Sequence, residues 1–86
     1  MKVTRETVAQ HLGDYLRGTL SIGGLVDWAE SAMGEGEFDE GQAALLSDVV
    51  ARIGVADVRA FGLTWEDCRD MLRSLGLSAK VDLVAA

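Results

Sequence analysis

Two side chains in this sequence, His11 and Cys68, are of the types most often used as a catalytic base and a nucleophile, and each is the only residue of its kind in the chain. Nucleophilic catalysis needs a base and an orienting acid around the nucleophile, and no such grouping of Ser, His and acid is recognisable at a strand-turn-helix elbow. His11 lies beside the apolar stripe of one predicted helix, and Cys68 occupies an apolar position of another. We therefore expect a hydrogen-bonded imidazole and a small buried hydrophobe, no catalytic residue, and a protein that is not an enzyme.

Carboxylates are concentrated in GEGEFDEG, residues 34–41, which contains Glu35, Glu37, Asp39 and Glu40. Their oxygens could bind a divalent metal ion, but the spacing imposes no coordination geometry, and Asp39 is placed to cap a helix. The glycines fit neither GxGxxG nor GxxxxGK[ST], the two patterns of phosphate-binding loops. We therefore expect a solvated acidic loop, with no metal and no cofactor.

The segment LRGTLSIGG, residues 16–24, is a second stretch in which glycines could build a binding loop. If Gly18 were the central glycine of a calcium loop, the ligand positions would be occupied by residues that supply no side-chain carboxylate: Gly13, Tyr15, Arg17 and Gly24. A DNA-reading helix-turn-helix is also disfavoured, because the second helix, IGGLVDWAE, has no cation to contact a phosphate. We expect a turn in which Gly18 ends one helix and Ser21 begins another, antiparallel helix.

The charge of the chain is distributed unevenly. The net charge is −6, and between Gly18 and Ala51 the sequence has seven Asp or Glu residues and no Lys or Arg. The remainder has seven acids against eight bases. An acidic surface repels nucleic acid backbones and attracts cationic surfaces, so we expect no nucleic acid ligand and a basic protein as partner.

Eight residues are candidates for contact with that partner. Trp28 lies at the margin of the apolar stripe of the second predicted helix, and Trp65 is the first residue of the last one, each beside acidic residues. Aromatic anchors with charged rims are typical of binding surfaces. The alternative is that both rings cover the edge of a small core, because tryptophan is seldom fully buried. The candidate set is Asp27, Trp28, Glu30, Glu35, Glu37, Asp39, Glu40 and Trp65.

The elements that must position these residues are predicted to be helices. Apolar residues recur at helical spacing, and Thr4, Ser21, Asp39 and Thr64 are suitable N-caps, three of them preceded by an apolar residue that can pack on the first turn. The expected helices are residues 4–17, 21–33, 39–53, 55–61 (short) and 64–75.

We expect an all-α fold, a compact four- to five-helix bundle that forms a single domain over residues 1–86, with residues 76–86 as an extended tail. A chain of 86 residues with 49% apolar residues and no proline can bury one small core. In the tail, Val81 and Leu83 alternate with Lys80 and Asp82, as in a half-buried strand, and residues 1–3 are the only candidate partner. We expect extended chain without a true sheet.

The single cysteine cannot form an internal disulfide, which favours a reducing compartment. No apolar run approaches the roughly 20 residues needed to span a bilayer, and MKVTRETVAQHLGDY lacks the apolar stretch of a signal peptide. We expect a cytoplasmic protein without membrane association.

The hairpin YLRGTLSIGGLVDWAES, residues 15–31, combines a helix end, a short Gly/Thr/Ser turn and a second, acidic amphipathic helix. It resembles the first hairpin of small acidic bacterial immunity proteins, including those that neutralise tRNA-cleaving colicins, and other uncharacterised bacterial helical proteins. The resemblance is confined to this hairpin, and GLTWEDCRDMLRSLG adds no diagnostic motif. It implies a small binding protein and transfers no functional residue.

Two functions are consistent with these observations. The first is a non-catalytic protein–protein interaction module, immunity-like or antitoxin-like in its specific form, whose acidic middle docks on a basic protein. The second is a structural homo-oligomer or a small subunit of a larger assembly, in which Trp28, Trp65 and the VDLV tail cover apolar surface.

Overall fold

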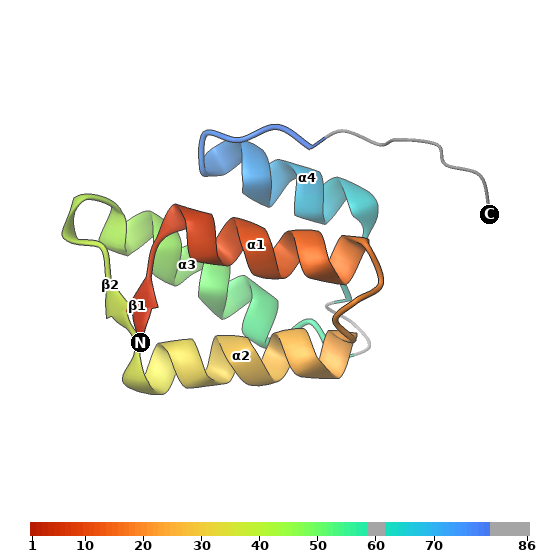
Figure 1. The fold of residues 1–86 in the computed structure, drawn as a ribbon, viewed down its shortest axis with the longest axis horizontal. Coiled ribbons are helices and arrows are strands. Elements are labelled where there is room, and N and C mark those ends of the chain that lie inside the picture. Colours follow the sequence, from red (N-terminus) through yellow and green to blue (C-terminus); the bar gives the residue numbers. More distant parts are fainter. Residues whose placement is uncertain (59–61, 80–86) are drawn as a thin grey trace.

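The fold is described here from a computed structural model, which describes residues 1–58 and 62–79. The elements in chain order are β1 (Lys2–Val3), α1 (Arg5–Leu16), α2 (Ile22–Glu35), β2 (Glu37–Phe38), the 3-10 helix η1 (Glu40–Gln42), α3 (Ala43–Gly54) and α4 (Trp65–Ser74). In Figure 1, α1 and α3 lie between α2 on one side and α4 on the other. The predicted helical bundle is confirmed.

The helix starts follow the predicted capping pattern. Thr4 and Thr7 form a reciprocal capping box at the start of α1, and Thr64 and Asp67 form one at the start of α4. The hydroxyl of Ser21 caps α2. Each box satisfies two backbone N–H groups that have no partner inside the helix.

The link between α1 and α2 is the predicted turn. Gly18 has φ of +80°, and the N–H of Thr19 donates to the carbonyl of Asp14 while the N–H of Gly18 donates to that of Tyr15. These two bonds form a Schellman motif, which needs a left-handed residue at the position of Gly18. The short turn brings α2 back antiparallel to α1 (Figure 1).

One core is shared by all four helices and β1. Its fully buried side chains include Val3, Leu12, Leu25, Leu46 and Leu75. The longest helix, α2, packs most extensively against α3, and α1 contacts both neighbours and α4. The apolar stripes predicted for the helices therefore close over one another.

The expected all-α class needs a correction, because the fold contains a two-stranded parallel sheet. Lys2 pairs with Glu37 and Val3 with Phe38. Lys2 and Val3 do form a strand, and the strand that pairs with them lies in the segment expected to be an acidic loop. The N–H of Glu37 donates to the carbonyl of Met1 at 2.7 Å, and that of Asp39 to the carbonyl of Val3 at 3.0 Å.

The boundary of the second helix also differs, since α2 continues through Gly34 to Glu35 instead of ending at Met33. A Cβ at Gly34 would meet nothing within 4 Å, so this glycine is simply an exposed helical residue. Its cost of about 1 kcal/mol relative to alanine is small beside the burial of Leu25 and Ala29 on the same helix.

The prediction of a short helix over residues 55–61 is wrong for residues 55–58, the part of this segment that the structure describes. Residues 55–58 form turns with hydrogen bonds from Ala56 to Ile53 and from Val58 to Val55. Ala56 is the buried residue here, while Val55 and Val58 are 39% and 49% exposed, so the expected apolar lid is not formed by these valines. Residues 59–61, including Phe61, lie outside the described residues, as do residues 80–86 of the predicted tail.

Candidate functional site

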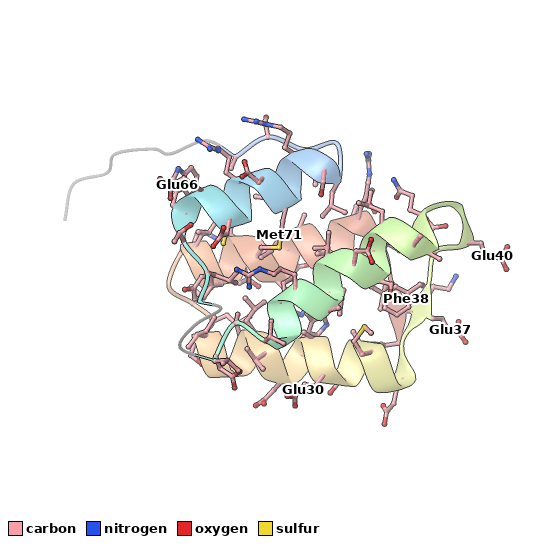
Figure 2. The ribbon with its side chains drawn as sticks, turned by 180° about the vertical axis from the view of Figure 1, so that it is seen from behind. Glu30, Glu37, Phe38, Glu40, Glu66 and Met71 are labelled. Atoms are coloured by element: carbon pink, nitrogen blue, oxygen red, sulfur yellow. The ribbon has the colours of Figure 1, made fainter. Side chains whose placement is uncertain are left out.

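Six carboxylates of the candidate set form what we call the acidic surface. All six are exposed, and they come from α2, from its C-terminal end, from β2 and from the start of η1: Asp27, Glu30, Glu35, Glu37, Asp39 and Glu40. Figure 2 shows Glu30 projecting from α2 away from the other helices, and Glu37 and Glu40 at the end of the molecule formed by β2 and η1. The acidic surface thus extends along one side of the protein and around one end.

The parallel strand pair determines where Glu37 lies. Side chains alternate between the two sides of a strand, so the apolar residues Val3 and Phe38 face the core while Lys2 and Glu37 face outward. Lys2 is therefore the neighbour of Glu37 in the sheet. The segment from Gly18 to Ala51 contains no Lys or Arg, but the fold places Lys2 beside Glu37 of this segment.

Gly36 is the residue that allows β2 to lie against β1. It ends α2 with extended backbone, φ −75° and ψ 142°. A Cβ at this position would collide with the carbonyl oxygen of Ala32 and lie 2.7 Å from Cγ2 of Val3. The close approach of the two segments therefore depends on the missing side chain.

A hollow of about 580 Å³ lies beside this sheet. It is lined by one cation, three carboxylates and two uncharged residues: Lys2, Thr4, Glu37, Phe38, Asp39 and Glu40. Sequence reasoning did not include Lys2, Thr4 or Phe38 in the candidate set. The charged-apolar order shared by Lys2-Val3 and Glu37-Phe38 was the available signal, because it matches two strands that expose their charged residues.

Asp39 has a structural role within the acidic surface. Its carboxylate accepts a hydrogen bond from the N–H of Gly41 at 3.3 Å and caps η1, and its carbonyl accepts from the N–H of Gln42. The helix expected at residues 39–53 therefore starts as a 3-10 turn before α3. Asp39 was correctly expected to cap, but no side chain caps α3 itself, because Gln42 makes no such hydrogen bond.

The acidic surface takes no part in the ion pairs among the described residues. These pairs are Arg5–Glu6, Arg17–Asp14, Arg52–Asp67 and Arg69–Asp70, and all their acids lie outside the segment from Gly18 to Ala51. Arginine therefore offsets negative charge over the rest of the described fold. The six carboxylates of the acidic surface form no ion pair with the described residues.

The two tryptophans occupy different environments. Trp28 is half-buried in α2 and stacks on His11 of α1, with ring centroids 4.0 Å apart and ring planes inclined by 13°. Trp65, the first residue of α4, is 37% exposed. The structure brings Trp28 against α1 and places Trp65 on α4, so it does not assemble the two rings with the carboxylates into one compact site.

The two chemically reactive side chains are both engaged in the fold. Nδ1 of His11 lies 2.6 Å from the carbonyl oxygen of Thr7, one turn earlier in α1. Cys68 is fully buried, and burial raises the pKa of its thiol, with the negative charge of Asp67 acting in the same direction. A raised pKa disfavours the thiolate, which is the nucleophilic form.

Within residues 1–58 and 62–79, no group of three or more His, Cys, Asp or Glu side chains is arranged to hold a metal ion. None of the described helices has the length and apolar character required to cross a bilayer.

Comparison with known proteins gives no relative from which the role of the acidic surface could be inferred. No family model matches the sequence, and no curated protein and no solved structure is significantly similar to it.

Proposed function

We propose that this protein is a small, non-catalytic interaction module whose acidic surface binds a basic protein. The observation that supports the proposal is the uneven pairing of charge. Four described arginines, Arg5, Arg17, Arg52 and Arg69, pair with acids outside the segment from Gly18 to Ala51. The six carboxylates of the acidic surface are exposed and have no ion-pair partner among the described residues.

Such a surface favours association in two ways. Its field extends into solvent over about 10 Å at 0.1 M salt, which steers a cationic partner during encounter. Its carboxylates are also available for charge-assisted hydrogen bonds to Arg or Lys of the partner, because these bonds do not first require an internal ion pair to break. An immunity-like or antitoxin-like protein, neutralising a basic target by covering it, is the specific form of this function that we favour.

The acidic surface is tested by charge reversal with a control of equal charge. Glu35→Lys, Glu37→Lys and Glu40→Lys change three exposed acids at one end of the protein. The control changes three exposed acids elsewhere, Asp57→Lys, Glu66→Lys and Asp70→Lys, and gives the chain the same net charge.

Immobilised wild-type protein is expected to retain a basic protein from a lysate of the source organism at low salt. With that protein purified, the first triple variant should lose binding, and the control should keep most of it. The association rate of the wild type should fall steeply as salt is raised. The proposal fails if no basic protein is retained, or if both triple variants lose binding equally, because net charge rather than the acidic surface would then explain the result.

Self-association is a second candidate, supported by large apolar side chains that remain exposed. Met33 and Val58 are each 49% exposed and Trp65 is 37% exposed. Exposed apolar surface of this kind can be covered by a second copy or by another subunit. Sedimentation equilibrium distinguishes this candidate: a mass equal to that of one chain at tens of micromolar removes the homo-oligomer.

A further inference from the structure

One edge of β2 has backbone groups without a partner. The N–H groups of Glu37 and Asp39 donate to β1, and successive residues of a strand direct their backbone groups to opposite edges. The N–H and C=O of Phe38 therefore point away from β1, and neither forms a hydrogen bond with any of the described residues. In Figure 1, β2 lies at one end of the fold. A strand edge of this kind can pair with a strand of another protein.

The surroundings of this edge are acidic. The hollow of about 580 Å³ beside the sheet is lined by Phe38, by the carboxylates of Glu37, Asp39 and Glu40, and by one cation, Lys2. Figure 2 shows Glu37 and Glu40 projecting from this end of the molecule, with Phe38 on the inner side of β2. The three carboxylates have no ion-pair partner among the described residues. A positively charged segment is therefore attracted to the place where the backbone groups are free.

Strand geometry specifies which side chains an added strand must present. Side chains of paired strands lie on the same face, position by position, and alternate between the two faces. The residue opposite Phe38 lies beside its half-buried ring, so an apolar side chain fits there. The residues before and after it lie on the face of Glu37 and Asp39, where Lys or Arg can form charge-assisted hydrogen bonds. The order is basic, apolar, basic, whether the added strand is parallel or antiparallel.

A second copy of this chain does not satisfy that requirement. Pairing of β2 with β2 of another copy would bring Glu37 and Glu40 of the two chains together, and like charges on neighbouring strands repel. The charge at this edge therefore favours a cationic strand from a different protein.

We propose that the free edge of β2 binds an extended basic-apolar-basic segment of a partner protein by strand addition at Phe38. The two cationic side chains of that segment lie against the carboxylates of Glu37, Asp39 and Glu40. This inference rests on the function proposed for the acidic surface, because it specifies the segment by which the basic partner docks. It also requires backbone pairing, which electrostatic attraction alone does not.

Titration with a synthetic peptide, followed by NMR, tests strand addition. The probe is Gly-Ser-Lys-Val-Arg-Ser-Gly with blocked termini, added to isotope-labelled protein at low salt. The amide signal of Phe38 should shift and its hydrogen exchange should slow, because its N–H gains an acceptor. The matched peptide has the same charges but is N-methylated at the valine and the arginine, so it cannot donate to the carbonyl of Phe38. It should bind roughly five-fold more weakly.

Charge variants of the protein identify the groups that the peptide contacts. Glu37→Gln should weaken binding several-fold, whereas Glu66→Gln, the same charge change at the opposite end of the molecule in Figure 2, should leave it nearly unchanged. Lys2→Gln should strengthen binding, because it removes the cation that repels the peptide from the hollow. Its control is Arg73→Gln, which removes an exposed cation from α4 and should have little effect.

The outcomes separate the two proposals. Strand addition is overturned if the peptide leaves the Phe38 amide unchanged, or if the N-methylated peptide binds equally well. The acidic surface then still stands as a binding site when a basic protein is retained from the lysate. Strand addition is also overturned if the Phe38 signal changes with protein concentration in the absence of peptide, because a second copy would then occupy the edge. The function proposed for the acidic surface fails separately, when no basic protein is retained.

Discussion

The imidazole of His11 and the indole of Trp28 stack nearly parallel, with ring centroids 4.0 Å apart, and this pair joins α1 to α2. Both side chains are half-buried, and the histidine is held from the other side by the contact of Nδ1 with the carbonyl of Thr7 at 2.6 Å. The geometry fixes the rotation of both rings. It gives His11 a structural role in the hairpin and leaves Trp28 only partly available to a partner.

A double-mutant cycle measures this stack. His11→Ala, Trp28→Ala and the double variant should give a coupling free energy of about 0.5–1.5 kcal/mol in urea unfolding, the usual range for an aromatic pair. The conservative variant Trp28→Phe keeps a ring and should keep most of the coupling to His11. Coupling within error of zero would mean that the rings share an edge of the core without stabilising each other.

Two glycines near the end of α2 should respond to alanine in opposite directions. Gly36→Ala places a Cβ against the carbonyl of Ala32 and Cγ2 of Val3, so β2 must move away from β1. We expect a loss of about 1–3 kcal/mol in the free energy of unfolding, as for other overpacked sites. Urea titration followed by circular dichroism measures the change.

Gly34→Ala is the matched control, because a Cβ there meets nothing within 4 Å and the residue is helical. This variant should be more stable than wild type by up to about 1 kcal/mol. Equal effects at the two positions would contradict the packing of β2 against β1.

The different roles of these two glycines could not be predicted from the sequence. Helix periodicity and capping residues are local, so Thr4, Ser21 and Thr64 could be assigned as caps from the letters around them. Strands of two residues are too short to show a period of hydrophobicity, and the sequence GEGEFDEG does not indicate that Val3 pairs with it. The contact between Gly36 and Val3 depends on how α1 and α2 pack, which is not encoded within either segment alone.

The same limit applies to the candidate site. The acids could be grouped from the sequence because most of them are close in the chain. They are exposed because those of α2 lie on the side of the helix away from the core, and because Glu37 lies on the outward-facing side of β2. The charged-apolar order of Lys2-Val3 and Glu37-Phe38 is compatible with two strands but does not show that they pair with each other, so Lys2 was left out of the candidate set. The partner of Trp28 was likewise hidden, because the stack on His11 depends on the length of the turn around Gly18.

Acid should remove the contribution of Asp67 to stability. The N–H of Thr64, at 3.0 Å, lowers the pKa of this carboxyl below its ordinary value of 3.8, with further contributions from the hydroxyl of Thr64 and the charge of Arg52. Because the folded pKa is the lower one, the carboxylate stabilises the fold fully above the ordinary pKa, and this contribution is lost as the pH falls through the folded value.

The measurement is the unfolding midpoint in urea as a function of pH for wild type and Asp67→Asn. The wild type should be more stable at neutral pH, and the difference should shrink as the pH falls below the ordinary pKa of 3.8 and disappear below the still lower pKa of the folded protein. Glu6, whose pKa is also lowered, titrates in both proteins and cancels in the comparison. A difference that persists unchanged at lower pH would show that the amide disturbs packing rather than removing a charge.

Labelling of Cys68 should report the opening of α4. The thiol is fully buried, and burial raises its pKa, so the sulfur of the folded protein is inaccessible and its thiolate form is disfavoured. With a disulfide reagent at mildly alkaline pH, we expect labelling to be roughly 100-fold or more slower than in the urea-unfolded chain, because the thiol reacts only when the helix unfolds locally.

Thr64→Ala removes the cap of α4 and costs about 1 kcal/mol, so it should accelerate labelling about five-fold in the native protein and leave the unfolded rate unchanged. A labelling rate in the folded protein close to that of the unfolded chain would place Cys68 at the surface and would contradict the packing of α4 on the core. Faster labelling of the Thr64→Ala variant would show that the thiol becomes exposed when the hydrogen bonds at the start of α4 are weakened.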